Sequence, residues 1–150
     1  MQFPSTEWFQ AVQKAAEAEV AMFRRIGFCD ATVRFDIRGD SRTRSFVLTF
    51  EDYGVTSVRE VAGDEEVDAD FCLSGDAAVW REMVENICAE GEADLAHTLN
   101  QLQLPGLLEL TAADQQRADL FYRYSQTFQQ FFNQAARVPT EFEPAAGGSS

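Results

Sequence analysis

The chain has 150 residues, of which 45% are hydrophobic and 25% are charged, a composition typical of one soluble globular domain. Its 12 basic and 25 acidic residues give a formal net charge of −13, which argues against a nucleic-acid partner and against docking on anionic membranes. The apolar runs are too short to span a bilayer, so no stable membrane insertion is expected, and the N-terminal sequence lacks the features of a signal peptide. We therefore expect a cytoplasmic protein.

The first predicted helix spans about residues 4–25, with Ser5 or Thr6 as its N-cap and Gly27 beyond its end. Its apolar positions share one face, but Glu19 projects into that same face. A buried Glu19 could act as a base or as a polar handle for a ligand headgroup. Alternatively, an arginine pairs with its carboxylate group.

Alternating apolar and polar residues predict two strands, at residues 32–38 and 46–51, that form an antiparallel hairpin. A third strand is expected at Gly54–Val61, and a short strand at Ala69–Leu73 follows an acidic loop. Because only one face of the hairpin is apolar, we expect helices to cover that face.

Arg34 and Arg38 lie on the polar face of the first predicted strand. They could hold the carboxylate or phosphate headgroup of a ligand. The alternative is pairing with Asp36 and with Glu51 of the neighbouring strand.

The C-terminal half is predicted to be helical. Ser74 or Asp76 caps a helix that ends near Ala89, a short helix begins at Asp94, and residues 102–106 form either a last strand or a helix exit. A final long helix, to about Arg137, carries an aromatic stripe on one face: Leu120, Phe121, Tyr124, Phe128, Phe131 and Phe132. Residues 139–150 are predicted to be a disordered tail.

The sequence indicates no metal, no cofactor and no catalytic site. Cys29, Cys72 and Cys88 form no CxxC pair, which predicts buried free thiols. His97 is the only histidine, and the acidic run at residues 64–70 lacks the spacing of a calcium-binding loop.

The segment Asp68–Trp80, DADFCLSGDAAVW, resembles the sterol carrier protein 2 (SCP2) family. In that family a strand ends in an apolar–Ser–Gly–Asp-like turn, and a helix with an aromatic or apolar anchor follows at once. The order of elements over about residues 30–132 is also similar, although residues 100–106 lack the lysines that many members have in their last strand.

The resemblance implies an α+β domain over residues 1–138, with an N-terminal helix, an antiparallel meander of about four to five strands covered on one face by helices, and the long aromatic helix over an apolar cavity. The expected ligand is a fatty acyl chain, an acyl-CoA or a sterol-like lipid. The side chains expected to line the cavity are Trp80, Met83, Ile87, Leu104, Phe121, Tyr124, Phe128, Phe131 and Phe132.

Other interpretations of the aromatic helix remain open. It could simply pack into a core that leaves no cavity. It could dock on an enzyme partner or on a second copy in a homodimer, in which case no ligand is needed. A third alternative is a role in lipid metabolism with Glu19 as a base inside the pocket.

Overall fold

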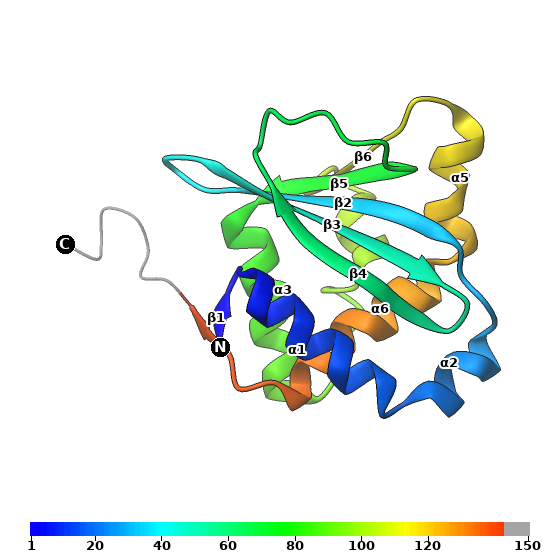
Figure 1. Cartoon of the computed structure of the whole chain (residues 1–150). Helices are drawn as coiled ribbons and strands as arrows, with labels where there is room; N and C mark the ends of the chain where they lie inside the picture. The colour runs from blue at the N-terminus through cyan, green and yellow to red at the C-terminus, as the bar shows by residue number, and fades with distance from the viewer. Residues whose placement is uncertain (143–150) are drawn as a thin grey trace.

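A mixed five-stranded sheet organises the computed structural model, which describes residues 1–142 (Figure 1). The strand order is β4-β3-β2-β5-β6. The first three strands form the predicted antiparallel meander, whereas β5 pairs parallel to β2, a feature that the sequence analysis did not anticipate. The strands are β2 (Ala31–Arg38), β3 (Thr43–Glu51), β4 (Gly54–Val61), β5 (Phe71–Asp76) and β6 (Leu108–Thr111).

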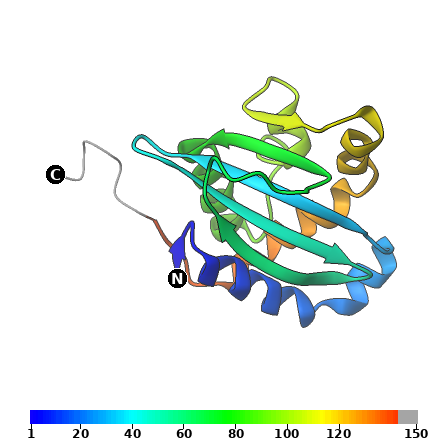
Figure 2. The same cartoon turned by 45° about the horizontal axis from the view of Figure 1, so that its top comes forward.

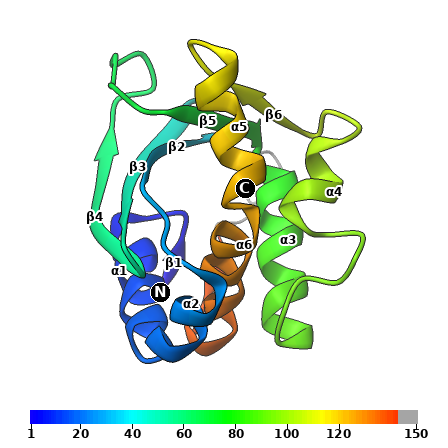
Figure 3. The same ribbon diagram turned by 90° about the vertical axis from the view of Figure 1, so that its right-hand side faces the viewer.

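Helices cover one face of this sheet, as predicted. Helices α1, α3 and α6 lie on the same side of the strands (Figure 3), and the chain between β4 and β5 passes over the opposite face (Figure 2). The helical elements are α1 (Thr6–Glu17), α2 (Val20–Ile26), α3 (Ala77–Glu90), α4 (Leu99–Gln103), α5 (Gln115–Arg123), α6 (Ser125–Asn133) and the 3-10 turn η1 (Gln134–Arg137).

Both helices predicted to be long are interrupted. The first breaks between α1 and α2, at Ala18 and Glu19, and the aromatic helix breaks at Tyr124, whose φ of −111° and ψ of 17° are not helical. A straight helix of the predicted length would extend about 35 Å, but a strand of eight residues spans only about 26 Å. The break therefore lets α6 follow the sheet while α5 turns to pack against β5.

Strand β5 ends three residues later than predicted, because its pairing with β2 continues through Gly75 and Asp76. Gly75 has a steric role there: a Cβ atom would lie 2.6 Å from the Leu108 side chain and 2.9 Å from the Leu107 carbonyl oxygen of β6 and its preceding turn. This close approach explains why a glycine stands between Ser74 and Asp76 at the end of β5, where the resemblance implied a turn.

In the C-terminal half, two boundaries differ from the prediction, and the structure decides one alternative that the sequence left open. Helix α4 begins after Thr98, whose side chain caps it, and not at Asp94. Residues 102–106 are the exit of that helix, and the last strand, β6, follows them. Part of the predicted tail, Glu141–Phe142, forms β7 and pairs with β1 (Gln2–Phe3), while residues 143–150 of that tail lie outside the described part of the chain.

Candidate functional site

Aromatic side chains fill the space between the sheet and the helices, and we call this cluster the aromatic layer. It comprises Phe35, Phe50 and Phe71 of the sheet, Trp80 of α3, Phe121 of α5, and Phe128, Phe131 and Phe132 of α6, each no more than 2% exposed. The ring centroids of Phe50 and Phe128 lie 5.0 Å apart, and those of Phe35 and Phe132 lie 5.2 Å apart, both with edge-on geometry. Such contacts are typical of a closely packed aromatic core.

The structure brings most of the predicted cavity residues together in or beside this layer. Met83 and Ile87 are fully buried on α3, and Tyr124 packs against the layer from its edge. Leu104 is not among them: its side chain is 75% exposed, because α4 ends there and buries Leu99 and Leu102 instead.

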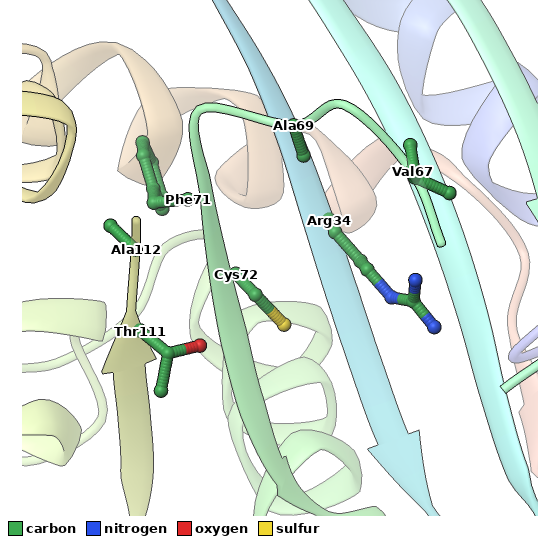
Figure 4. Close-up of a pocket in the computed structure, with 7 residues that line it drawn as sticks. All are labelled: Arg34, Val67, Ala69, Phe71, Cys72, Thr111 and Ala112. Carbon is green, nitrogen blue, oxygen red and sulfur yellow. The ribbon is translucent and has the colours of Figure 1, made fainter. Parts of the chain in front are cut away.

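Two surface hollows lie outside the interior of the layer. One, of about 310 Å³, opens on the outer face of the sheet over Arg34 and Cys72, with Phe71 at its margin (Figure 4). The other, of about 370 Å³, lies between α1 and the β3–β4 turn. Neither of these two hollows is lined by residues of α6, and rings of the layer pack edge-on against one another where the resemblance placed a cavity.

Four residues around this layer are not among the predicted cavity residues. Phe35, Phe50 and Phe71 face the helices from the sheet, and the period-two alternation of the strands was the signal that could have identified them. Phe28, in the loop before β2, is 50% exposed and its ring centroid lies 6.2 Å from that of Tyr124. Through this pair the aromatic layer reaches the surface.

Arg34 lies on the opposite face of the sheet and is bound to protein groups. Its Nε donates to Asp36 Oδ1 at 2.8 Å, and its terminal nitrogens donate to the carbonyl oxygens of Gly63 at 2.8 Å and Glu65 at 2.5 Å. With 12% of its side chain exposed, Arg34 fixes the β4–β5 connection to the sheet. Arg34 does pair with Asp36, but within one strand and not across two, and within residues 1–142 neither Arg34 nor Arg38 forms an ion pair with Glu51.

Arg38 and Glu19 also have protein partners. Arg38 donates to Ser74 Oγ at 2.7 Å and to Asp76 at 3.2 Å on the outer face. Glu19 forms an ion pair with Arg137 of η1, the alternative considered from the sequence. The structure therefore does not bring these two side chains, or Arg34, to the aromatic layer.

His97 and Asp94 form a hydrogen-bonded pair at the surface. His97 Nδ1 lies 2.6 Å from Asp94 Oδ1, and the pKa of Asp94 is lowered mainly by this hydrogen bond. Within residues 1–142, no group of three or more His, Cys, Asp or Glu side chains could hold a metal ion. No helix in the same range is both long and apolar enough to cross a membrane.

The three cysteines are free but differ in exposure. The prediction that all are buried holds for Cys29, whereas Cys72 is half-buried and Cys88 is exposed at the end of α3. Burial, reinforced by nearby carboxylates, raises the pKa of Cys29 and of Cys72 to about 12. Asp36 is the carboxylate beside Cys72, and its Oδ2 accepts a hydrogen bond from the thiol at 3.4 Å.

We expect iodoacetamide at pH 8 to alkylate Cys88 rapidly and the other two thiols slowly. A thiol with a pKa near 12 is ionised to only about one part in ten thousand at that pH, and the thiolate is the nucleophile. Mass spectrometry of timed digests measures the rates, and labelling in urea is the control because unfolding should remove the difference. Equal rates in the folded protein would contradict the raised pKa of Cys29 and of Cys72.

Three solved structures resemble this fold. A conserved hypothetical protein from Thermus thermophilus, a possible sterol carrier protein, matches with a TM-score of 0.70 and 21% identity, over 95% of this chain and 92% of that chain. A crystal structure of sterol carrier protein 2 matches with a TM-score of 0.68 and 21% identity, over 89% and 96% respectively. Sterol carrier protein 2 from Yarrowia lipolytica, in its apo form, matches with a TM-score of 0.50 and 15% identity, over 85% of this chain and 88% of that chain.

No family model matches the sequence, and no curated protein matches it. The structural similarity nevertheless covers nearly the whole chain in the two stronger matches. The chain therefore has the SCP2-like α+β fold that the Asp68–Trp80 segment predicted.

Proposed function

We propose that this chain binds one apolar molecule, such as a fatty acyl chain, an acyl-CoA or a sterol-like lipid, between its sheet and its helices. The proposal is supported by the fold, which is shared with structures named sterol carrier protein 2. It is also supported by an interior lined almost entirely with apolar side chains, to which Met83 adds an adaptable one. Transfer of each CH₂ group of a ligand from water into such a site contributes about 0.8 kcal/mol.

Binding in this space would displace aromatic rings, because the rings of the layer pack edge-on against one another there. Of the two helices that carry the aromatic stripe, α5 moves at lower cost: one of its nine residues, Phe121, is buried, whereas α6 buries five. The non-helical backbone at Tyr124 supplies a hinge between the two helices. This weak anchoring of α5 is the observation that carries the proposal.

Two side-chain contacts hold the outer surface of α5 to the rest of the chain. Tyr122 Oη donates to Gln103 Oε1 at 3.1 Å, and the Arg117 guanidinium lies 3.5 Å from Asp68. Both are exposed, so each contributes little to stability. The ring centroid of Phe121 lies 5.9 Å from that of Phe71 and 6.4 Å from that of Phe128. Rotation of α5 about Tyr124 would withdraw Phe121 from both rings.

Native mass spectrometry of the freshly purified full chain, before and after organic extraction, tests the proposal. We expect one bound apolar molecule that is lost on extraction. Addition of oleate, oleoyl-CoA or cholesterol to the extracted protein should restore one equivalent of at least one of them, raise the melting temperature and change the fluorescence of buried Trp80. A ligand-free mass together with an unchanged melting temperature for all three probes would contradict the proposal.

Phe121→Ala and Phe46→Ala form a matched pair for the role of α5. Both remove a fully buried ring, but Phe46 contacts Phe9 of α1, at 4.8 Å between centroids, and not α5. Ligand association in stopped-flow measurements should become about tenfold faster in Phe121→Ala and change little in Phe46→Ala, since only the first loosens the moving helix. If ligand association became faster by the same factor in both variants, the increase would be due to general destabilisation and not to release of α5.

A further inference from the structure

The hollow of about 370 Å³ between α1 and the β3–β4 turn lies outside the aromatic layer, and we call it the α1 hollow. Its walls come from α1, from Val20 of α2 and from the turn that contains Tyr53, which lie at the same end of the molecule (Figure 1). The most buried residues that line it, Ala16 and Val55, belong to the hydrophobic core. Gln13 Nε2 donates to the Val55 carbonyl oxygen at 2.6 Å, so a direct contact holds the two walls together.

Two exposed apolar side chains face the solvent in the α1 hollow. Val20, on the helical wall, is 42% exposed, and Tyr53, in the turn, is 39% exposed. A compact apolar group seated between them would remove both surfaces from water, and this burial favours binding. The volume of the α1 hollow is within the range of small-molecule sites, about 300–1,000 Å³.

The charged side chains that line the α1 hollow are both acidic. Glu17 is the last residue of α1 and Glu51 is the last residue of β3, so each wall contributes one exposed carboxylate. Within residues 1–142 neither carboxylate forms an ion pair. Arg24 lies over the Tyr53 ring, 5.5 Å from its centroid, which shows that this ring is accessible to a cation.

This combination of apolar walls and two carboxylates selects the charge of a ligand. The carboxylates would repel an anion, and a neutral apolar molecule would gain nothing from them. A primary ammonium group has one positive charge and three N–H donors, so it can bind both carboxylates at once. A small molecule can reach the buried residues of the α1 hollow, whereas the flat surface of a macromolecule would meet only its rim.

We propose that the α1 hollow binds a small organic amine. The ammonium group lies between Glu17 and Glu51, and the apolar body of the amine packs against Val20 and Tyr53. This site shares no lining residue with the aromatic layer, so it is separate from the proposed site for an apolar molecule.

NMR titration of the ¹⁵N-labelled full chain tests the proposal, with hexylamine as the probe. Hexanol and hexanoate are its controls, because they have the same apolar chain but are neutral and anionic. Hexylamine should shift amide resonances of residues 13–20 and 51–56, and its dissociation constant should be at least about fivefold lower than that of hexanol. Hexanoate should bind more weakly than hexanol.

A matched pair of double variants tests the two carboxylates. Glu17→Gln with Glu51→Gln removes both charges from the α1 hollow, whereas Glu90→Gln with Glu92→Gln removes two exposed charges that do not line it. Hexylamine should bind about tenfold more weakly to the first and within about twofold of wild type to the second. Hexanol binding should be unchanged in both, which shows that the walls remain folded.

Three results would overturn the proposal: equal affinity for hexylamine and hexanol, equal weakening in the two double variants, or shifts confined to residues outside 13–20 and 51–56. A fourth is binding of Nα-acetyl-lysine methylamide about tenfold or more tighter than hexylamine, which would identify a lysine of a partner protein as the occupant. Oleate, oleoyl-CoA and cholesterol should leave the resonances of the α1 hollow unshifted, so the failure of either proposal can be recognised without the other.

Discussion

Phe132→Ala is expected to lower the free energy of unfolding by about 3–5 kcal/mol, the range for truncation of a fully buried Phe. The Phe132 ring is 0% exposed at the centre of the aromatic layer. Its centroid lies 5.2 Å from that of Phe35 and 5.8 Å from that of Trp80. The loss is a large share of a typical domain stability of about 5–15 kcal/mol, because both the transfer free energy and the packing of the neighbouring rings are forfeited.

Urea unfolding followed by circular dichroism measures this change, and Phe28→Ala is the control. Phe28 is a ring of the same size that is 50% exposed, so its removal should cost about 1 kcal/mol or less. A loss below about 1.5 kcal/mol in Phe132→Ala would indicate that the layer is loosely packed around this ring. In that case a ligand could enter without movement of α5.

Arg34→Ala is expected to lower the free energy of unfolding by about 2–4 kcal/mol. The substitution removes the cationic partner of Asp36, whose carboxylate is 21% exposed, and leaves the carbonyl oxygens of Gly63 and Glu65 without the Arg34 donor. Limited proteolysis should then cut the β4–β5 connection faster, because Arg34 binds the carbonyl groups of Gly63 and Glu65 to the sheet.

Arg38→Ala is the matched control on the same strand and face. Its side chain is 38% exposed and its partner Asp76 is 71% exposed, so a change of about 1 kcal/mol or less is expected. Arg34→Lys keeps the charge but loses the planar fork that reaches several acceptors, and should fall between the two alanine variants. Equal stability of the two alanine variants would contradict the structural role of Arg34.

The burial of the aromatic rings also bears on whether the aromatic helix can bind a protein partner. Phe131 is 1% exposed and Phe132 is fully buried, so neither ring is available to a protein partner in the folded chain. The docking alternative considered from the sequence would need these rings on the surface. Exposed aromatic side chains beside this helix include Tyr122 of α5 and Phe28, which packs against Tyr124.

Local pattern was sufficient for much of the fold. The alternation of Val33, Phe35 and Ile37 predicted both the strand and its buried face, and the boundaries of β4 matched at both ends. Ser5 does cap α1, accepting a hydrogen bond from the Trp8 amide at 3.0 Å. These features depend on residues a few positions apart, so they can be read from one sequence.

Tertiary structure decided what local pattern could not. The parallel pairing of β5 with β2 joins segments far apart in the chain, and the break at Tyr124 depends on the length of the sheet that α5 and α6 must cover. The aromatic stripe on residues 120–132 determined which side chains would be buried, but not whether they would enclose a cavity. That depends on the rings contributed from the other side: Phe35, Phe50 and Phe71 fill the space beneath the helices, because packing volume is a property of the assembled layers and not of either element alone.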